Sequence, residues 1–421
     1  MNVVIIGGGT AGSTVAFYLR KLNKDVNITI VENSKFTQFS PCSLPYYITN
    51  EISDLFVFKE QDYKSANIDL RLNTDVSSID KKNKVVHTSA GNINYDKLVL
   101  ATGTKNFIPD GFNGLTLKNP DDIFLIDKKC KKGKSIGIIG GGFIGVEMAY
   151  VLKQRGCEVS LFEATEQILP NLDKDMSEYI KSYLESNGVS VYVGSIPKQK
   201  ENAISVNNQS HTFDEIIIST GFVPNLDAAK ELGLKIDKGI VVDDYLSADK
   251  DVYACGDCVV VKDFVLGNKI QAYFATHAVN QAEIVSENIL GAKKKFHPVL
   301  NANISNIGIY FGSVGISSKT AEKNGIKVIS AKSKGTTKSD HHKHSKEIVA
   351  KIIVDSKGTL LGGQIIGGED ISGRINLLSL AIKKKNTIYD LAELETCYNP
   401  ASTPIFDVIV KAARMCIRRM G

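Results

Sequence analysis

A pattern of strand, glycine turn and helix occurs twice in this chain and constrains its fold more than any other feature. The two copies begin about 133 residues apart, so they are not a short tandem repeat. In each copy an apolar strand, at residues 3–6 and 136–139, runs into a glycine turn and a helix, predicted through residues 19 and 152. The glycines are Gly7, Gly9 and Gly12 in the first copy and Gly140, Gly142 and Gly145 in the second. Both copies open a βαβ unit, so we expect an α/β fold with two doubly wound sheets.

Each glycine turn has the spacing that binds the pyrophosphate of a dinucleotide. The first glycine permits the tight bend, the second lets the backbone approach the phosphates, and the third lets the helix pack on the strand. The next strand of each copy ends in an acid, Glu32 or Glu163, whose carboxylate can accept hydrogen bonds from a ribose. The alternative is that the glycines serve only for packing and that the glutamates are ordinary surface residues. It explains the acid at the end of each following strand less well. Two such sites in one chain predict electron transfer between two dinucleotides.

The residues after Glu163 bear on the choice between NADH and NADPH. A 2′-phosphate needs a cation at the end of this strand, but Ala164, Thr165 and Glu166 follow. The second acid repels a phosphate. We therefore favour NADH over NADPH.

Composition excludes several classes of protein. At about 150 residues per domain, 421 residues predict two or three domains, and 43% hydrophobic residues are enough for a core. A net charge of +5 over this length is too weak to indicate nucleic acid and also suits a small anionic ligand. The chain has no apolar run of 18 residues and no signal sequence, so we expect a cytoplasmic protein that does not act at a membrane. Seven irregularly spaced cysteines do not predict a disulfide framework.

Three further regions complete the expected organisation. Apolar strands at residues 98–103 and 216–221 each end in Thr-Gly, and a strand at 251–258 precedes a helix at 275–290. After residue 295 the composition changes, with strands predicted at 348–354 and 360–366 and a helix at 373–384. The polar stretch 332–346 is expected to be a loop. This C-terminal region predicts a third, α+β domain.

Five motifs give the chain a resemblance to a known family. VVIIGGGTAG, LVLATG, IGIIGGGFIGVE, STGFVPN and DVYACGDC occur in the order and spacing of the FAD-dependent pyridine nucleotide-disulfide oxidoreductases. The resemblance implies FAD in the first dinucleotide site, NAD(P)H in the second, and a homodimer in which the third domain completes the partner subunit's active site. The resemblance implies three domains. Two are Rossmann-like: an FAD-binding domain (1–110 with 240–294) and an NAD(P)H-binding domain (111–239). The third is a dimerisation domain (295–421). The resemblance also implies that Thr102, Gly103 and Asp257 contact the flavin cofactor and that Phe143 gates the nicotinamide.

Cys42, in the segment FSPCSLPYYI, is the main candidate for the reactive group. Pro41 suits the first turn of a helix, so we expect Cys42 where helix N–H groups lower its pKa and stabilise a thiolate. Glutathione-reductase-like members have a second cysteine five positions on, where this chain has Tyr47. A single sulfur must cycle through a mixed disulfide, a persulfide or a sulfenic acid. The alternative is an inert buried thiol.

The segment around Cys42 resembles those of coenzyme A disulfide reductases and of NAD(P)H sulfur or polysulfide reductases. We therefore expect a disulfide, persulfide or polysulfide substrate, with coenzyme A as a candidate ligand. One alternative is an NADH oxidase or peroxidase, although those members place a histidine in the first glycine turn, where this chain has Thr10. The others are a membrane-associated NADH or sulfide:quinone oxidoreductase and a non-enzymatic flavin redox sensor.

Three more residues are carried over from the coenzyme A disulfide reductases. Tyr398 is expected to reach the reactive sulfur of the other subunit and to protonate a leaving thiolate, the alternative being an interface-packing aromatic. Lys21 and Arg71 lie where those members place cations for nucleotide phosphates. The loop that holds a second tyrosine there reads Asp340-His341-His342-Lys343-His344 here, which weakens the case for coenzyme A.

Other conspicuous residues receive structural interpretations. The histidines of residues 341–344 are expected to be solvated rather than to bind a metal, and no metal site is predicted. The Cys255 and Cys258 pair is expected to be structural because the flavin motif already explains its turn. The basic amphipathic stretch 405–420 is expected to be a dimer-interface helix rather than one that lies on a membrane.

Overall fold

A six-stranded sheet forms the N-terminal part of the computed structural model, which describes residues 1–369 and 371–421. Its strand order is β17-β18-β7-β1-β2-β3, and every neighbouring pair is parallel except β17 and β18. The strands are β1 (Asn2–Ile6), β2 (Asn27–Val31), β3 (Asp69–Arg71), β7 (Lys97–Leu100), β17 (Ser247–Asp249) and β18 (Val252–Ala254). The central strands are almost wholly apolar and buried, as expected for a parallel sheet covered on both faces.

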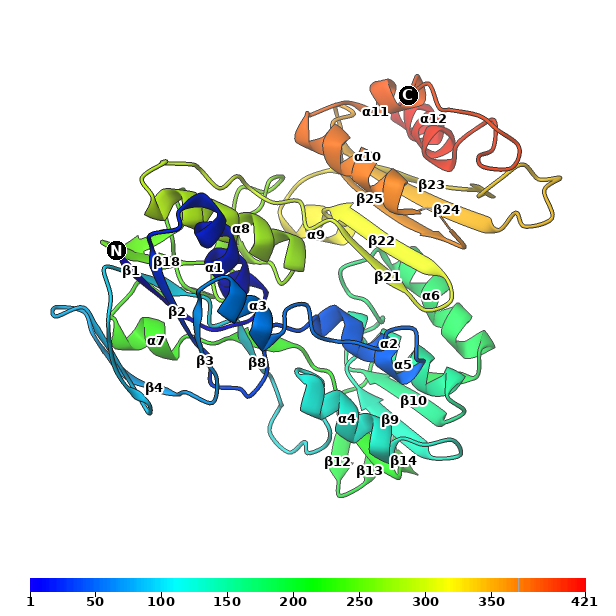
Figure 1. Cartoon of the computed structure of the whole chain (residues 1–421). Coiled ribbons are helices and arrows are strands. Elements are labelled where there is room, and N and C mark those ends of the chain that lie inside the picture. The colour runs from blue at the N-terminus through cyan, green and yellow to red at the C-terminus, as the bar shows by residue number, and fades with distance from the viewer. Residues whose placement is uncertain (370) are drawn as a thin grey trace.

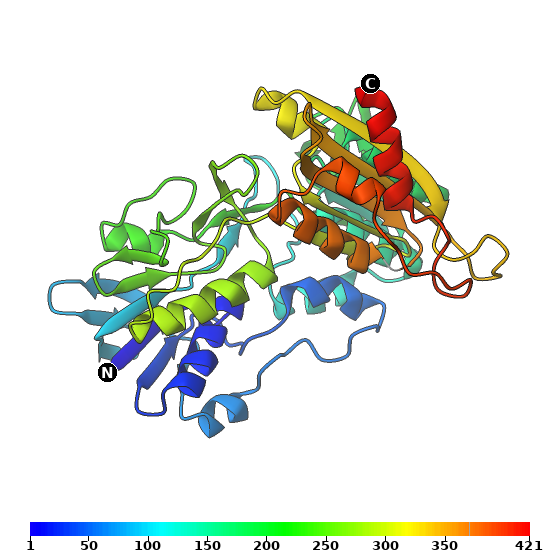
Figure 2. The same ribbon diagram turned by 90° about the horizontal axis from the view of Figure 1, so that it is seen from above.

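Two helices from distant parts of the chain lie side by side on this sheet. They are α1 (Thr10–Leu22), which follows the first glycine turn, and α8 (Ala275–Ile289), and Figure 2 shows them next to each other. A meander of β4 (Val76–Asp80), β5 (Val85–Thr88) and β6 (Gly91–Asn94) lies beside the sheet, and short helices α3 (Glu60–Ser65) and α7 (Asp227–Glu231) flank it.

The second glycine turn belongs to a separate four-stranded parallel sheet. Its order is β11-β10-β9-β15, formed by β9 (Ser135–Ile139), β10 (Glu158–Glu163), β11 (Val189–Val193) and β15 (Glu215–Ile218). Helices α4 (Pro120–Lys129), α5 (Phe143–Gln154) and α6 (Lys174–Ser186) accompany this sheet, as does a meander of β12 (Lys198–Lys200), β13 (Ala203–Val206) and β14 (Gln209–Thr212). The chain enters this unit through β8 (Thr104–Asn106) and leaves it through β16 (Phe222–Pro224), and these two strands pair with each other in antiparallel fashion.

The C-terminal region is a five-stranded antiparallel sheet, shown above the second sheet in Figure 1. Its order is β21-β22-β25-β24-β23, formed by β21 (Asn303–Asn306), β22 (Tyr310–Gly315), β23 (Val328–Thr336), β24 (Glu347–Asp355) and β25 (Leu360–Gly367). Helices α10 (Ile371–Lys383), α11 (Ile388–Ala392) and α12 (Val408–Met420) pack on one face, and α9 (Ser318–Lys323) follows β22. On the other face, Phe311, Val349 and Ile366 share a core with the second sheet and its helices. The predicted α/β class with a C-terminal α+β domain is therefore confirmed.

The prediction of a loop over residues 332–346 is wrong in its first third. Residues 332–336 belong to β23, which pairs with β24 along nine residues. The stretch is polar because β23 is the edge strand, where lysines protect the free backbone from pairing with other chains, while Ala331 and Ser333 point into the core. Only the tip of this hairpin, residues 337–346, lies outside a strand.

The C-terminal helix begins at Val408 because Asp407 caps it, accepting a hydrogen bond from the Ile409 N–H at 2.9 Å. Its apolar face is buried by the chain's own β23, β24 and α11. In the described part of the chain, none of the helices has the length and apolar content needed to span a bilayer.

Candidate active site

The first glycine turn has the backbone geometry of a phosphate cradle. Gly7 has φ +103°, and a Cβ there would lie 2.3 Å from the Ala101 carbonyl oxygen. A Cβ on Gly12 would lie 1.8 Å from the Gly7 carbonyl oxygen, so the helix can approach the strand only without one. A Cβ on Gly9 would meet no protein atom within 4 Å, and this open side faces no side chain of the chain itself.

Glu32 is fixed beside this turn by backbone donors. Its Oε2 accepts a hydrogen bond from the Gly8 N–H at 2.7 Å, and its Oε1 accepts one from the Ser34 N–H at 2.8 Å. The carboxylate is thereby held between the end of β2 and the glycine turn. It is placed to receive the hydroxyls of a ribose whose phosphates lie on the turn.

The second glycine turn repeats the same arrangement. Gly140 has φ +109°, a Cβ on Gly145 would lie 1.9 Å from the Gly140 carbonyl oxygen, and Gly142 is open. Glu163 accepts hydrogen bonds from the N–H groups of Gly141 and Thr165, each at 2.8 Å. The equivalence of the two carboxylates, down to the atoms that hold them, makes both turns dinucleotide cradles.

Asp257 lies in the turn after β18, at the carboxyl edge of the first sheet. Burial raises its pKa, and the positive charge of Lys118 opposes that shift. Thr102 and Gly103, at the end of β7, lie at the same edge, where Thr102 Oγ1 donates to the Asn225 carbonyl at 2.7 Å. A Cβ on Gly103 would meet nothing within 4 Å.

The chain around Asp257 has polar groups that fit a bound flavin nucleotide. Among the described residues, buried polar atoms without a partner include Tyr273 Oη and Asn225 Oδ1, and the Asn225 carbonyl is the group that Thr102 contacts. Tyr273 is close enough to Asp257 for that carboxylate to raise its pKa, which reaches about 12 mainly through burial. Unpaired buried polar atoms beside an open glycine cradle are typical of a site that a polar ligand completes.

Lys118, for which the sequence predicted no role, is half-buried. Its ammonium donates to Thr104 Oγ1 and lies 4.5 Å from the centre of the Phe222 ring. Burial lowers its pKa, and the charge of Asp257 raises it in part. Lys118 and Asp257 therefore lie close enough for the charge of each to shift the pKa of the other.

Cys42 lies on a single 3₁₀ turn, Pro41–Ser43, that precedes the short helix α2 (Leu44–Ile48). Cys42 is exposed, which argues against the alternative of a buried thiol. The expectation of a lowered pKa is wrong. The protein packed beneath the thiol raises its pKa, and the charges of Glu147 and Asp257 raise it further. A helix of five residues has too small a dipole to outweigh two carboxylates.

Glu147, on α5, is the functional candidate that the sequence analysis quoted within a motif without giving it a role. Its Oε1 accepts a hydrogen bond from Ser305 Oγ at 2.6 Å and lies 3.5 Å from Tyr46 Oη. Burial raises its pKa to about 7, against the lowering effect of both hydrogen bonds. The available signal was an acid one turn after Phe143 in an otherwise apolar helix.

Phe143 is the first residue of α5 and is half-buried. Its ring stacks on that of Phe311, with the centroids 5.8 Å apart and the planes at 6°. Phe143 and Glu147 lie one helical turn apart, so they share a face of α5.

The remaining predicted residues lie apart from Cys42. Tyr398 is 51% exposed and lies in the segment between α11 and α12. Lys21 is exposed and lies 6.0 Å from the Tyr18 ring centre. Arg71 pairs with Asp69 at 2.9 Å, and its carbonyl accepts from the Glu32 N–H, which places it beside the first ribose position. Among the described residues of one chain, none of the three forms a hydrogen bond with Cys42.

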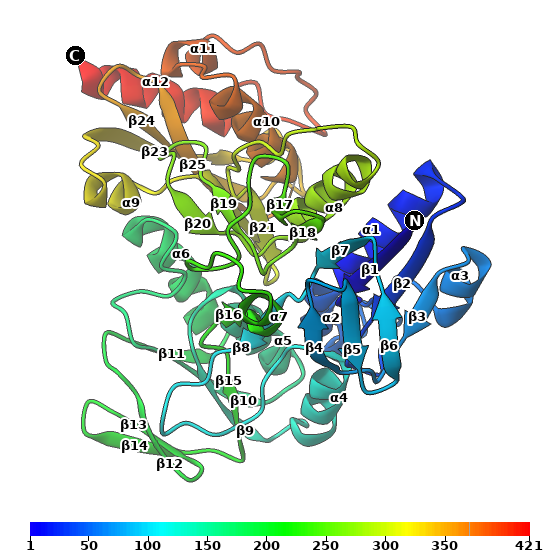
Figure 3. The same ribbon diagram turned by 90° about the vertical axis from the view of Figure 1, so that its left-hand side faces the viewer.

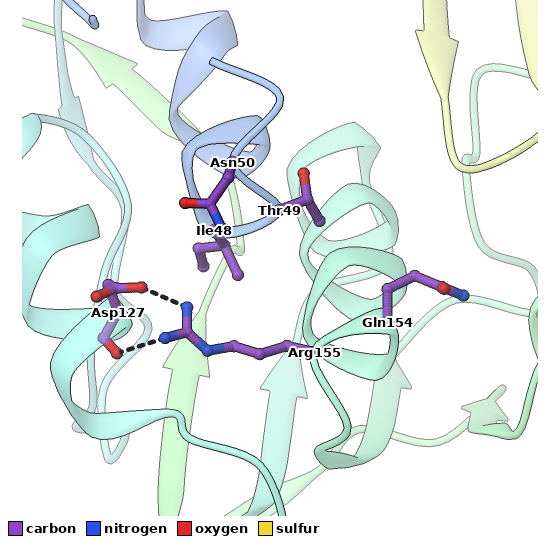
Figure 4. Close-up of a pocket in the computed structure, with 6 residues that line it drawn as sticks. All are labelled: Ile48, Thr49, Asn50, Asp127, Gln154 and Arg155. Carbon is purple, nitrogen blue, oxygen red and sulfur yellow. Dashed lines mark hydrogen bonds and ion pairs between the residues drawn. The ribbon is translucent and has the colours of Figure 1, made fainter. Parts of the chain in front are cut away.

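Two other features do not contribute to the site. His341, His342 and His344 are at the β23–β24 hairpin tip, and the described residues contain no cluster of three His, Cys, Asp or Glu side chains placed to hold a metal ion. A surface hollow at the end of α2 lies between α4 and α5, and its Arg155 is already engaged by the carboxylate and carbonyl of Asp127 (Figure 4). Its lining residues are Ile48, Thr49, Asn50, Asp127, Gln154 and Arg155.

Two glycine turns with the geometry of dinucleotide cradles, together with an exposed thiol, are the features expected of a flavin-dependent pyridine nucleotide oxidoreductase. Residues 1–282 match the pyridine nucleotide-disulphide oxidoreductase family, and residues 307–407 match the dimerisation domain of that family. The chain therefore belongs to the pyridine nucleotide-disulphide oxidoreductases. The predicted family, the FAD and NAD(P)H cofactors and the oxidoreductase activity are thereby confirmed.

Relatives match the chain along its whole length. It is 36% identical to an NADH oxidase of Methanocaldococcus jannaschii, covering 100% of both chains. It is 26% identical to the NAD(P)H coenzyme A polysulfide/persulfide reductase of Pyrococcus horikoshii, covering 98% of both. The structure of an NAD-dependent persulfide reductase from A. fulgidus superposes with a TM-score of 0.95 at 30% identity, over 100% of this chain and 83% of the other.

Proposed function

We propose that the protein reduces a sulfur substrate, taking electrons from NADH through FAD and delivering them at Cys42. The observation that carries this proposal is the exposed thiol of Cys42, electrostatically coupled to Asp257, with Tyr47 at the position of a second redox cysteine. The names of the relatives from Pyrococcus horikoshii and A. fulgidus support a persulfide or polysulfide as the substrate.

The chain's own residues would bind and orient the two dinucleotides. The first turn, with Gly7, Gly9 and Gly12, holds the FAD pyrophosphate and Glu32 its ribose, while Thr102, Gly103 and Asp257 line the flavin side. The second turn, with Gly140, Gly142 and Gly145, holds NADH, and Glu163 accepts its ribose hydroxyls, which favours NADH over NADPH. Phe143 covers the nicotinamide position. When bound, FAD supplies the hydride acceptor between the nicotinamide and Cys42.

Cys42 carries out the sulfur chemistry. Its thiolate attacks a substrate sulfur, so a bond from Cys42 Sγ to that sulfur forms while the substrate S–S bond breaks and a thiolate or hydrosulfide leaves. Two electrons from NADH then break the new S–S bond, so that the Cys42 thiolate is restored and the sulfur bound to it leaves as a second thiolate or hydrosulfide. The partner subunit's Tyr398 is placed by this proposal to protonate the leaving sulfur.

The proposal includes a homodimer and three domains. The match of residues 307–407 to a dimerisation domain supports self-association. The first sheet supports the FAD domain (1–110 with 240–294), the second the NADH domain (111–239), and the antiparallel sheet the dimerisation domain (295–421). The name of the Pyrococcus horikoshii relative supports coenzyme A as a ligand, with Lys21 and Arg71 as its candidate cations. We place the enzyme in the cytoplasm.

A second candidate activity is the reduction of oxygen by NADH. The NADH oxidase of Methanocaldococcus jannaschii is the relative that supports it. Thr10, the first residue of α1, argues against a reaction with peroxide. Its hydroxyl cannot replace an imidazole as a proton donor at neutral pH.

The proposal is tested by the steady-state turnover of two variants, in each of which one cysteine is replaced. Cys42→Ser is expected to bind FAD normally and to lose NADH-dependent reduction of polysulfide and of coenzyme A disulfide by at least about 100-fold. Cys397→Ser is the matched control, because Cys397 is the other exposed cysteine, and it is expected to retain activity. Full sulfur reduction by Cys42→Ser contradicts the proposal. Oxygen consumption that outpaces sulfur reduction in the parent favours the oxidase instead.

A further inference from the structure

The tip of the β23–β24 hairpin lies against the turn that carries Tyr398. We call residues 337–346 the hairpin tip and residues 397–403 the tyrosine turn. The Ser339 N–H donates a hydrogen bond to the Pro400 carbonyl oxygen at 3.2 Å, and Figures 1 and 2 both show the two segments side by side. Two segments that are far apart in the sequence therefore form one surface.

Both segments are held in a defined shape by their own contacts. At the base of the hairpin tip, Glu369 pairs with Lys338 at 2.8 Å and with Lys346 at 3.2 Å. In the tyrosine turn, Thr403 Oγ1 donates a hydrogen bond to the Cys397 carbonyl oxygen at 2.8 Å. The side chains of this surface are therefore presented from a fixed backbone.

The apex of the hairpin tip presents nitrogen donors to solvent. His341, Lys343 and His344 are all exposed, and none of them forms an ion pair with a carboxylate among the described residues. Asp340 is the only acid in the tip, and it accepts a hydrogen bond from Thr336 Oγ1 at 2.8 Å. An ammonium group and imidazole N–H groups donate hydrogen bonds to anions. The apex is therefore suited to an anionic ligand.

The surroundings of Cys42 in its own chain are unfavourable to an anion. The carboxylates of Glu147 and Asp257 are the charged groups that act on the thiol, and both raise its pKa. Persulfides and polysulfides are anions in neutral water, so a substrate of this kind is repelled by the same carboxylates. A cation brought to the thiol from another part of the molecule would offset this repulsion.

The hairpin tip accompanies Tyr398 wherever the tyrosine turn goes, because the two segments are hydrogen-bonded to each other. Within one chain the tip does not contribute to the site, but in the proposed dimer the partner's Tyr398 reaches Cys42. We propose that His341, Lys343 and His344 enter the partner's site with this tyrosine and select an anionic sulfur substrate over an uncharged disulfide. This inference rests on the proposed function. The three side chains bind the substrate and take no part in breaking its S–S bond.

The test compares the rates at which an anionic and an uncharged reagent, iodoacetate and iodoacetamide, alkylate Cys42 in the FAD-loaded, NADH-reduced protein, measured by peptide mass. Both reagents attack the same thiolate, so the ratio of their rates reports the charge beside the thiol. In a variant that combines His341→Gln, Lys343→Gln and His344→Gln, the iodoacetate to iodoacetamide ratio is expected to fall about fivefold. Added salt should lower the ratio in the parent more than in this variant.

Lys357→Gln is the matched control. Lys357 is exposed in the turn between β24 and β25, at the other end of β24 from the hairpin tip, and its loss removes a positive charge from the same sheet. The alkylation ratio should therefore stay that of the parent. Equal ratios in the parent and the triple variant overturn the proposal, as does an equal fall in Lys357→Gln.

A cross-link tests the position of the hairpin tip directly and decides the question if the triple variant does not fold. Lys343→Cys is combined with Cys397→Ser, which removes the other exposed thiol, and the protein is treated with a short bismaleimide. A covalent dimer is expected, and it should be lost when Cys42→Ser is added. Absence of a dimer that depends on Cys42 overturns the proposal. Neither measurement requires turnover, so a failure of sulfur reduction alone contradicts only the proposed function.

Discussion

At the scale of single residues, the two ribose-facing glutamates have separable roles even though their surroundings are alike. Glu32 and Glu163 each accept two backbone hydrogen bonds beside a glycine turn. A carboxylate fixed in this way offers its remaining lone pairs to a ligand without loss of side-chain entropy. The proposal assigns Glu32 to FAD and Glu163 to NADH, so equivalent substitutions should affect different cofactors.

Glu163→Gln is expected to raise the KM for NADH about tenfold with little change in kcat, because a charge-assisted hydrogen bond to the ribose is lost. The preference for NADH over NADPH should narrow, since the charge that repels a 2′-phosphate is gone. Initial rates with both nucleotides measure this. Glu32→Gln is the control, and it should lower FAD retention instead. An unchanged KM in Glu163→Gln contradicts the assignment of the second turn to NADH.

Two substitutions of Tyr398 can distinguish a role in proton donation from a role in packing at the dimer interface. Tyr398→Phe keeps the ring and removes only the hydroxyl, so we expect it to lower kcat for sulfur reduction about tenfold while the dimer persists. Tyr398→Ala should lower kcat and weaken the dimer. The measurements are turnover and sedimentation velocity. If Tyr398→Phe is as active as the parent while Tyr398→Ala is not, the tyrosine packs at the interface and donates no proton.

The sequence could not reveal the environment of Glu147 or the pKa of Cys42, because both depend on contacts between distant segments. Tyr46 and Ser305 are 101 and 158 residues from Glu147. The local rule for Cys42, a proline-started helix that stabilises a thiolate, was overridden by desolvation of the thiol and then by two carboxylates from other parts of the chain. The glutamates after each glycine turn were found because their partners lie within 24 residues.

At the scale of elements, the two glycine turns were predictable because each is a local pattern with a local cause. The third glycine of each turn permits contact between helix and strand, and the second leaves space where a ligand would lie. Edge strand β23 was missed as a strand over residues 332–336 because its polar sequence reflects its position in the sheet, which the local pattern does not contain.

Alanine substitutions of two glycines in the second turn should therefore affect different properties, one stability and the other NADH binding. Gly145→Ala places a Cβ 1.9 Å from the Gly140 carbonyl oxygen and is expected to lower the free energy of unfolding by about 1–3 kcal/mol. Gly142→Ala meets no protein atom, so stability should be retained while NADH affinity falls. Thermal unfolding and NADH titration of each variant distinguish the two effects. Equal losses of stability contradict this division.

At the scale of the whole molecule, a buried ion cluster fixes the C-terminal sheet to the second dinucleotide unit. Lys351 of β24 lies 2.8 Å from a carboxylate oxygen of Asp173 and 2.7 Å from one of Asp175, at the start of α6. Asp173 also accepts hydrogen bonds from the N–H and hydroxyl of Ser318 at 2.8 and 2.7 Å. These contacts hold Phe311 and Ser305 of the C-terminal sheet in register with Phe143 and Glu147 of α5.

Lys351→Met is expected to lower the free energy of unfolding by about 3 kcal/mol, because it leaves the Asp173 carboxylate buried without its cation. Urea unfolding at pH 7 measures the loss. Lys332→Met is the matched control, since Lys332 pairs with Asp175 at 3.0 Å but, among the described residues, not with Asp173, and is more exposed; it should cost less than about 1 kcal/mol. Equal costs would show that the buried cluster does not fix the two units.

In the proposed mechanism, electrons leave the flavin at Cys42. Mass spectrometry of the Cys42 peptide during turnover tests this step most directly. Protein mixed anaerobically with polysulfide or coenzyme A disulfide and then quenched should have an adduct of sulfur or coenzyme A on Cys42. The adduct should disappear when NADH is added. If the Cys42 peptide stays unmodified at every time point while NADH is consumed and the substrate is reduced, the electrons take another route.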